Sequence, residues 1–100
     1  MSEAYRFEIA AWALDRQAGE VESCVGRLRG RVDQTIRGGR WKGPSADNHW
    51  RATEDRCGRM YRAARMMREL ATRFRARARQ IRDEEERRRR AALAGGGGAW

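Results

Sequence analysis

GGRWKGP, residues 38–44, lies near the middle of this 100-residue chain and decides how the chain folds. The stretch holds three of the eleven glycines and the only proline. Glycine reaches positive φ without penalty, and proline cannot continue a helix that arrives from the preceding residues. Glycines also commonly end one helix, and proline is favoured in the first turn of the next. The stretch therefore predicts a helix, a chain reversal and a second helix.

Small or apolar residues recur at alternating spacings of four and three on both sides of this reversal. Before it they are Phe7, Ala11, Leu14, Ala18, Val21, Val25, Leu28 and Val32; after it they are Ala46, Trp50, Thr53, Cys57, Met60, Ala64, Met67, Ala71, Phe74, Ala78 and Ile81. Such a repeat marks one buried stripe on each helix. Folding the chain at the reversal pairs the stripes level by level, from Val32 opposite Trp50 to Phe7 opposite Phe74. The sequence therefore predicts an all-α fold, an antiparallel helix-turn-helix hairpin.

The chain divides into three expected units. They are a hairpin over 3–82 (helix about 3–37, turn 38–44, helix about 45–82), a charged helical extension over 83–90, and a flexible glycine-rich tail over 91–100. The extension is expected to be helical because four acidic residues precede four arginines, and pairs at spacing four stabilise a solvated helix. Trp100 is interpreted either as a docking hook or as part of a disordered tail.

A two-helix hairpin hides only one stripe per helix, so it is marginal unless a partner covers a second face. Six side chains off the stripes belong to the end away from the turn: Tyr5, Ile9 and Trp12 on the first helix and Ala63, Met66 and Leu70 on the second. Scattered surface hydrophobic residues are common, but a group of this size favours a partner helix. We expect these six to form a partner interface, with two hairpins pairing into a four-helix bundle as a homodimer or heterodimer.

The net charge is +9, and all but one of the 23 basic residues are arginine. A basic composition is compatible with nucleic acid or an anionic membrane surface, and equally with solvated helix faces. No segment is long and apolar enough to span a membrane, and the N-terminus does not resemble an ordinary secretory signal. The protein is expected to be cytoplasmic when made, unless an exporter of another kind takes it folded.

Catalytic and metal-binding chemistry is not expected. His49 is the only histidine and is expected on the surface, with no nucleophile or second ligand beside it. We therefore predict a non-enzymatic protein without a metal or cofactor. Cys24 and Cys57 fall at the same level of the hairpin, within disulfide reach. A bond between them is one expectation if the destination is oxidising, and two reduced thiols that only pack are the other.

Trp41-Lys42-Gly43, at the reversal point of a hairpin in a chain of this length, resembles the WXG family of ESAT-like proteins. These are small substrates of type VII (ESX) secretion systems in actinobacteria and related Gram-positive bacteria. The resemblance covers roughly residues 3–82. It implies export without a signal peptide, with Trp41 and Gly43 in a turn that forms part of a composite export signal. It also implies pairing with another WXG-like or larger helical secreted protein, and transient binding to the membrane ATPase of the system.

The chain departs from that family in two ways. Members that carry the export signal usually have a tyrosine followed four residues later by an acid, after the second helix; here Tyr61 lies within that helix and Arg65 follows it at that spacing. Many well-known members are also acidic, so a basic chain is expected to pair with an acidic partner. Two other functions stay open: a basic helical nucleic-acid-binding protein, resting on Arg73, Arg75, Arg77, Arg79, Arg82 and Arg87–Arg90, and a cytosolic immunity or chaperone partner of a neighbouring effector.

Overall fold

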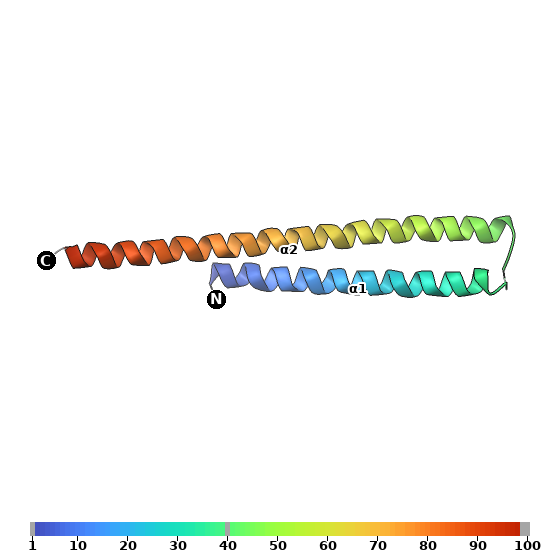
Figure 1. The fold of residues 1–100 in the computed structure, drawn as a ribbon, viewed down its shortest axis with the longest axis horizontal. Coiled ribbons are helices and arrows are strands. Elements are labelled where there is room, and N and C mark those ends of the chain that lie inside the picture. Colours follow the sequence, from blue (N-terminus) through green and yellow to red (C-terminus); the bar gives the residue numbers. More distant parts are fainter. Residues whose placement is uncertain (1, 40, 99–100) are drawn as a thin grey trace.

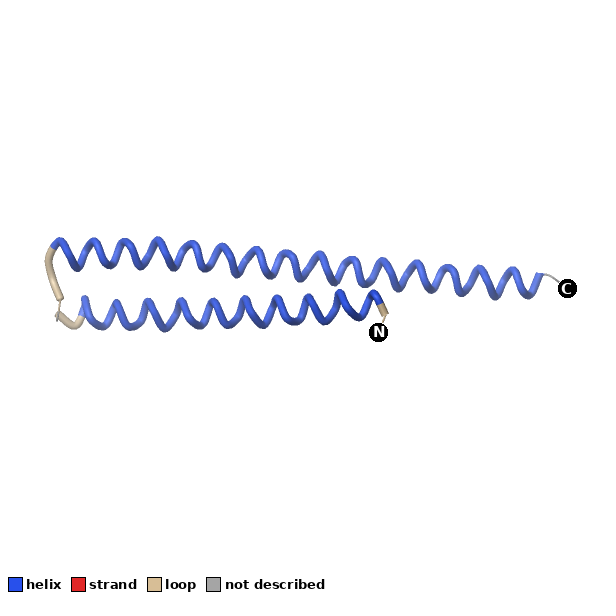
Figure 2. Tube along the Cα trace, turned by 180° about the vertical axis from the view of Figure 1, so that it is seen from behind, coloured by secondary structure: helices blue, strands red, loops and turns tan. Residues whose placement is uncertain are grey.

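The computed structural model describes residues 2–39 and 41–98. Within them the chain forms helix α1, Glu3–Arg37, and helix α2, Pro44–Gly98. The two helices lie side by side and antiparallel in a rod of 87 × 16 × 16 Å, with the turn at one end (Figure 1). The view from behind shows the same pairing, with the only described loop between the helices at that end (Figure 2). The predicted all-α hairpin is confirmed.

Local sequence sets both ends of α1. The side chain of Ser2 caps its N-terminus by accepting a hydrogen bond from the Tyr5 N–H at 3.1 Å. At the other end, the Gly38 N–H donates to the Gln34 carbonyl at 2.9 Å, and the chain then leaves the helix through Gly39 at a φ of 75°. Glycine takes this left-handed conformation without the clash that a Cβ atom causes. The predicted end of the first helix near Arg37 is therefore confirmed.

The smallest stripe residues form the fully buried centre of the hairpin. They recur every seven residues in each helix: Ala4, Ala11, Ala18, Val25 and Val32 in α1, and Cys57, Ala64, Ala71 and Ala78 in α2. We call these residues the close seam. A seven-residue repeat keeps one face of a helix towards its partner over many turns. Each residue predicted for the two stripes is buried or half-buried in the structure, and Ala4 extends the first stripe by one further position.

The bulky stripe residues pack beside the close seam and are less completely covered. Phe7 and Phe74 meet edge to face, with ring centroids 5.4 Å apart, as the predicted level pairing requires. Near them Ala4, Ala78 and Ile81 form a buried cluster against which Phe7 packs. Phe7 and Phe74 themselves stay half-buried. The hairpin thus buries the small residues of the close seam, whereas its bulky stripe residues, apart from Ile81, are covered only in part.

The C-terminal part of α2 differs from the expected division. The predicted flexible tail was wrong for residues 91–98, because α2 continues without a break through the charged extension to Gly98. Arg90 and Arg89 pair with Glu86 at 3.1 and 3.3 Å, and alanine and leucine follow, which are strong helix formers. α2 therefore projects beyond the N-terminus of α1 as a single helix (Figure 1). Trp100 lies outside the described residues.

Enlarging a residue of the close seam should weaken the hairpin. Ala71 is 0% exposed, so Ala71→Leu must push the helices apart or force strained side chains, at a cost of about 1–3 kcal/mol in the free energy of unfolding. The matched variant Ala76→Leu adds the same group at an exposed position of α2 and should change that free energy by less than about 0.5 kcal/mol. Urea unfolding followed by circular dichroism measures both. Equal losses of unfolding free energy in the two variants would contradict the close approach of the helices at Ala71.

Candidate functional site

One side of the hairpin carries a ladder of charged residues that joins the two helices. Its members recur every seven residues: Glu8, Asp15, Glu22 and Arg29 in α1, and Glu54, Tyr61, Arg68, Arg75 and Arg82 in α2. At about 3.6 residues per turn, each series forms one column along its helix, next to the close seam. We call these residues the ladder and the side that they occupy the ladder face.

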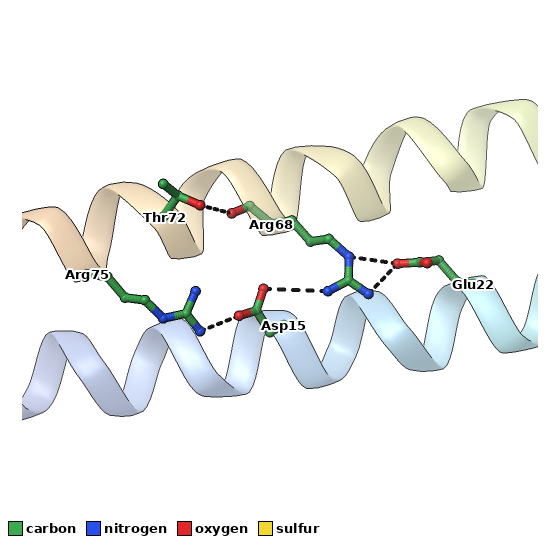
Figure 3. Close-up of polar contacts among 5 residues, drawn as sticks. All are labelled: Asp15, Glu22, Arg68, Thr72 and Arg75. Carbon is green, nitrogen blue, oxygen red and sulfur yellow. Dashed lines mark hydrogen bonds and ion pairs between the residues drawn. The ribbon is translucent and has the colours of Figure 1, made fainter.

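Arginines of α2 bridge successive acids of α1 in the middle of the ladder. The Arg68 guanidinium donates to Glu22 at 2.8 Å through Nε, and its Nη1 lies 3.7 Å from Asp15. Arg75 donates to the other carboxylate oxygen of Asp15, so one acid is held between two arginines (Figure 3). Further from the turn, Arg82 pairs with Glu8 at 2.5 Å. These contacts cross between the helices and fix their register.

The polarity of the ladder reverses near the turn. Here the cation is on α1 and the acid on α2: Arg29 donates to both oxygens of Glu54, at 2.9 and 2.6 Å. The Arg29 guanidinium also lies 5.8 Å from the centroid of the Tyr61 ring. Hydrogen bonding to Arg29 holds the pKa of Glu54 below its usual value, and the same bond raises the pKa of Arg29. The pair therefore stays ionised at neutral pH.

The ladder was missed at the level of sequence, although the spacing that reveals it is present there. The seven-residue recurrence of the three acids before Arg29, and of the three arginines after Tyr61, is the signal. In antiparallel coiled coils, the columns flanking the buried seam face each other across the interface and carry such pairs. The predicted register rested on the apolar columns, and the charges of the hairpin itself were interpreted only as composition.

Among residues 2–39 and 41–98, the opposite side of the hairpin carries no such ladder, and we call that side the open face. It is formed by the bulky stripe residues and the columns beside them: Phe7, Ala10, Leu14, Gln17, Val21, Cys24 and Leu28 of α1, and Met60, Ala63, Met66, Met67, Leu70 and Phe74 of α2. A shallow hollow of about 350 Å³ lies there, lined by Leu14, Met66, Met67, Glu69, Leu70 and Arg73. A second, of about 280 Å³, is lined by Glu3, Arg6, Phe7, Ala10 and Phe74. Apolar side chains line the floor of this face.

The six residues predicted as one partner interface are all exposed, but they lie on two sides of the hairpin. Trp12 follows the buried Ala11 by one residue, whereas Leu70 precedes the buried Ala71 by one, and Ala11 and Ala71 share a level. One step along a helix is a rotation of about 100°, so these two steps lead to opposite faces. Tyr5, Ile9 and Trp12 lie towards the ladder face and the outer side of α1; Ala63, Met66 and Leu70 lie on the open face of α2. Treating the six as one patch is corrected accordingly, because no single partner helix can cover both groups.

The turn holds the Trp-x-Gly motif in a defined local structure. The half-buried Trp41 packs its ring on that of His49, with centroids 5.0 Å apart, and shares a hollow of about 130 Å³ with Val32 and Ile36. Trp41 therefore folds over the end of the hairpin near Val32 and Ile36, in contact with His49. Gly43 has a φ of 101°, which glycine adopts readily and other residues rarely do. Gly43 thus leads the chain into α2, where its carbonyl accepts the first helical hydrogen bond at 3.1 Å.

The two cysteines are not bonded to each other. Cys57 is buried in the close seam, while Cys24 is exposed on the open face, and both are free thiols. Of the two alternatives stated for these residues, the structure contains the two separate thiols and not the disulfide clip. Across the described residues, no group of three or more His, Cys, Asp and Glu side chains is placed to hold a metal ion. Neither α1 nor the described length of α2 is long and apolar enough to cross a membrane.

Comparison with protein-family models, curated proteins and solved structures finds no match to this chain. The resemblance to the WXG family therefore depends on the Trp41-Lys42-Gly43 motif and on its place in the hairpin.

Reversing one charge of the ladder should weaken the hairpin, and swapping the pair should restore it. Glu8→Arg places two cations together and should lower the free energy of unfolding by about 0.5–1 kcal/mol, because the pair is partly exposed. Glu8→Arg with Arg82→Glu should recover most of the loss, which a double-mutant cycle in urea measures. Glu69→Arg, at an exposed acid outside the ladder, is the control and should have little effect. A double variant no more stable than Glu8→Arg would show that the ion pair between Glu8 and Arg82 does not stabilise the hairpin.

Replacing Gly43 should strain the turn. Gly43→Ala puts a Cβ atom on a residue at positive φ and should cost about 1–2 kcal/mol of stability. Gly30→Ala is the matched control, since Gly30 is inside α1 with open space around it; alanine there should stabilise the hairpin by up to about 1 kcal/mol. Thermal unfolding of both variants measures whether each substitution lowers or raises the stability of the hairpin. A gain in stability for Gly43→Ala would mean that the turn does not require glycine.

Proposed function

We propose that this protein is a small, non-enzymatic component of a type VII secretion system, exported itself or co-exported as the partner of another helical protein. The observation that carries the proposal is the Trp41-Lys42-Gly43 motif at the chain reversal of an antiparallel hairpin. In this turn Trp41 packs over the end of the helices and Gly43 takes a conformation suited to glycine. A Trp-x-Gly turn in a hairpin of this size is the mark of the WXG family.

The surface supports a partner protein as the natural complement of this hairpin. Met66 is 68% exposed and Leu70 39% exposed beside the half-buried Leu14 and Met67. A helical pair laid on that face would convert a marginal two-helix structure into a four-helix bundle with a second buried layer. Tyr61 of α2 is followed at a spacing of four by Arg65 and not by an acid, which favours the partner as the subunit that supplies the tyrosine-acid signal.

The charge distribution speaks against nucleic acid as the principal ligand. Of the arginines on which that alternative rests, Arg75 and Arg82 are held by acids of the ladder, and Arg89 and Arg90 pair with Glu86. A nucleic-acid footprint needs basic side chains that are free to meet phosphates on one face. Four of the nine arginines thus serve contacts within the hairpin and within α2. The unpaired Arg73 and Arg77 border apolar side chains, which a nucleic acid would leave uncovered.

Export by the type VII system is the direct test. We expect the protein in washed culture filtrate of the source organism, and its loss from the filtrate when the membrane ATPase of the system is deleted. Trp41→Ala should remove it from the filtrate by at least about tenfold while the purified variant stays helical, because Trp41 covers the end of the hairpin and is not part of the close seam. Lys42→Ala, at the exposed middle position of the motif, is the control and should be exported normally.

Retention of the unaltered protein inside the cell in both strains would overturn the proposal. That outcome would direct attention to a cytosolic role as an immunity protein or chaperone of a neighbouring effector. Equal export of Trp41→Ala and the unaltered protein would show that the turn is structural only.

A further inference from the structure

The two faces of the hairpin differ in how many of their side chains find partners within the hairpin. On the ladder face, Glu8, Asp15, Glu22 and Glu54 each contact an arginine of the other helix. On the open face, the bulky stripe residues stay half-buried and the residues beside them are mostly small or apolar. The hollow on the ladder side is lined mainly by charged residues, whereas the one at Leu14 is lined mainly by apolar ones. The open face is therefore the side still available to a partner.

The spacing of the apolar residues on this face is that of helix-to-helix packing. Leu14 and Val21 are seven residues apart in α1, and so are Met60 and Met67 in α2. Ala63 and Leu70 continue the same interval in the column beside them. Seven-residue intervals on both edges of a groove provide the holes into which side chains of further helices insert. Leu14, Val21, Met60 and Met67 also use this interval to pack α1 on α2, and Ala63 and Leu70 repeat it outside that contact.

Arginines without an acidic partner lie along both edges of the open face. By their register they are Arg6, Arg27 and Arg31 on α1 and Arg56, Arg73 and Arg77 on α2; among the described residues none of the six forms an ion pair. Arg6 lines the hollow at the end away from the turn, Arg31 lines the hollow at the turn, and Arg73 lines the hollow between them. The nearby acids are fewer, namely Glu3, Glu20, Asp55 and Glu69; Arg16 already holds Glu20, and Arg59 already holds Asp55. The apolar floor is thus bordered by free positive charge.

We infer that the open face binds a helical partner whose apolar stripe is flanked by acidic residues. This inference rests on the proposed function for the existence of a partner and adds which face it covers and its charge. Acidic flanks would meet Arg6 at the end away from the turn, Arg73 in the middle, and Arg31 and Arg56 towards the turn. Apolar side chains of the partner would cover Leu14, Met66 and Leu70. Complementary charges of this kind choose between partners more than they add affinity.

A second copy of the same chain is disfavoured as the occupant. Two open faces brought together would place the unpaired arginines of one copy near those of the other, and like charges facing each other oppose association. An anionic bilayer would meet the arginines but would not use the seven-residue spacing of the apolar floor. An acidic amphipathic helix pair satisfies both features at once.

The test uses the protein itself as the source of an acidic face. A copy carrying Arg6→Glu, Arg31→Glu, Arg56→Glu and Arg73→Glu has the same apolar floor with acidic edges. A control copy carrying Arg51→Glu, Arg62→Glu, Arg65→Glu and Arg79→Glu has the same net charge, with the changes away from the open face. Helicity of each copy is checked by circular dichroism before mixing. Sedimentation velocity and fluorescence anisotropy then measure association with the unaltered protein.

The expected result is a 1:1 complex of the unaltered protein with the acidic-edged copy, at least about tenfold tighter than with the control copy and weakened by added salt. Leu70→Gln in the unaltered protein should weaken that complex at least about tenfold. Trp12→Gln, which makes a similar change on the other side of the hairpin, should leave it unchanged. This contrast separates the open face from the side of Tyr5 and Trp12.

Three results would overturn the inference. Equal binding of the two acidic copies would indicate attraction by net charge alone. A dimer of the unaltered protein as tight as the mixed complex would make a second copy the occupant. Binding to phosphatidylglycerol vesicles that Leu70→Gln abolishes, with no complex between the two copies, would make an anionic membrane the occupant. The mixing experiment needs no secretion apparatus, so a failure of export leaves its result intact, and a failure to form the complex leaves export untouched.

Discussion

The close approach of the two helices along their small residues is the constraint on which the other features depend. Every residue of the close seam is an alanine, a valine or a cysteine. Because the distance between helix axes depends on the size of the side chains at the contact, the two backbones can lie near each other. Bulky residues such as Phe7 and Met67 do not fit within so narrow a gap. They are displaced to one flank and stay half-buried. On the other flank, the short gap lets an arginine of α2 reach a carboxylate of α1. The two different faces are thus both consequences of the small residues.

The ladder supplies what a seam of alanines cannot, which is a choice of register. Small residues at a constant interval pack almost as well after one helix slips by seven positions. The reversal of polarity near the turn prevents this. A slip in one direction sets Glu22 against Glu54, and a slip in the other sets Arg29 against Arg68. Each slip therefore replaces an ion pair with a like-charge contact, which is a common way to exclude an alternative pairing.

Periodicity and turn chemistry were sufficient to predict the hairpin, its stripes and its reversal, because these features are written in local sequence. The side of the hairpin on which Trp12 and Leu70 lie was not predicted, because the six apolar residues were grouped by their level along the hairpin and not by their rotation about the helix axes. The offsets of Trp12 from Ala11 and of Leu70 from Ala71 already contain that rotation, since each residue turns a helix by about 100°. The continuation of α2 past residue 90 was missed for another reason. The prediction of a flexible tail rested on the glycines, and the alanines and paired charges that precede them favour a helix.

The motif and the open face belong to one continuous surface. Arg31 and His49, which line the hollow at Trp41, lie seven residues from Cys24 and Arg56, the next positions along the two edges of the open face. Trp41 is therefore placed at the turn end of the same groove that displays Leu14 and Leu70, and not on the ladder face. A partner that covered the full length of the groove would approach the indole ring of Trp41 directly. If the proposed partner binds there, its contact surface would begin where the Trp41 turn ends, and binding of the partner and recognition of the turn would be coupled through position.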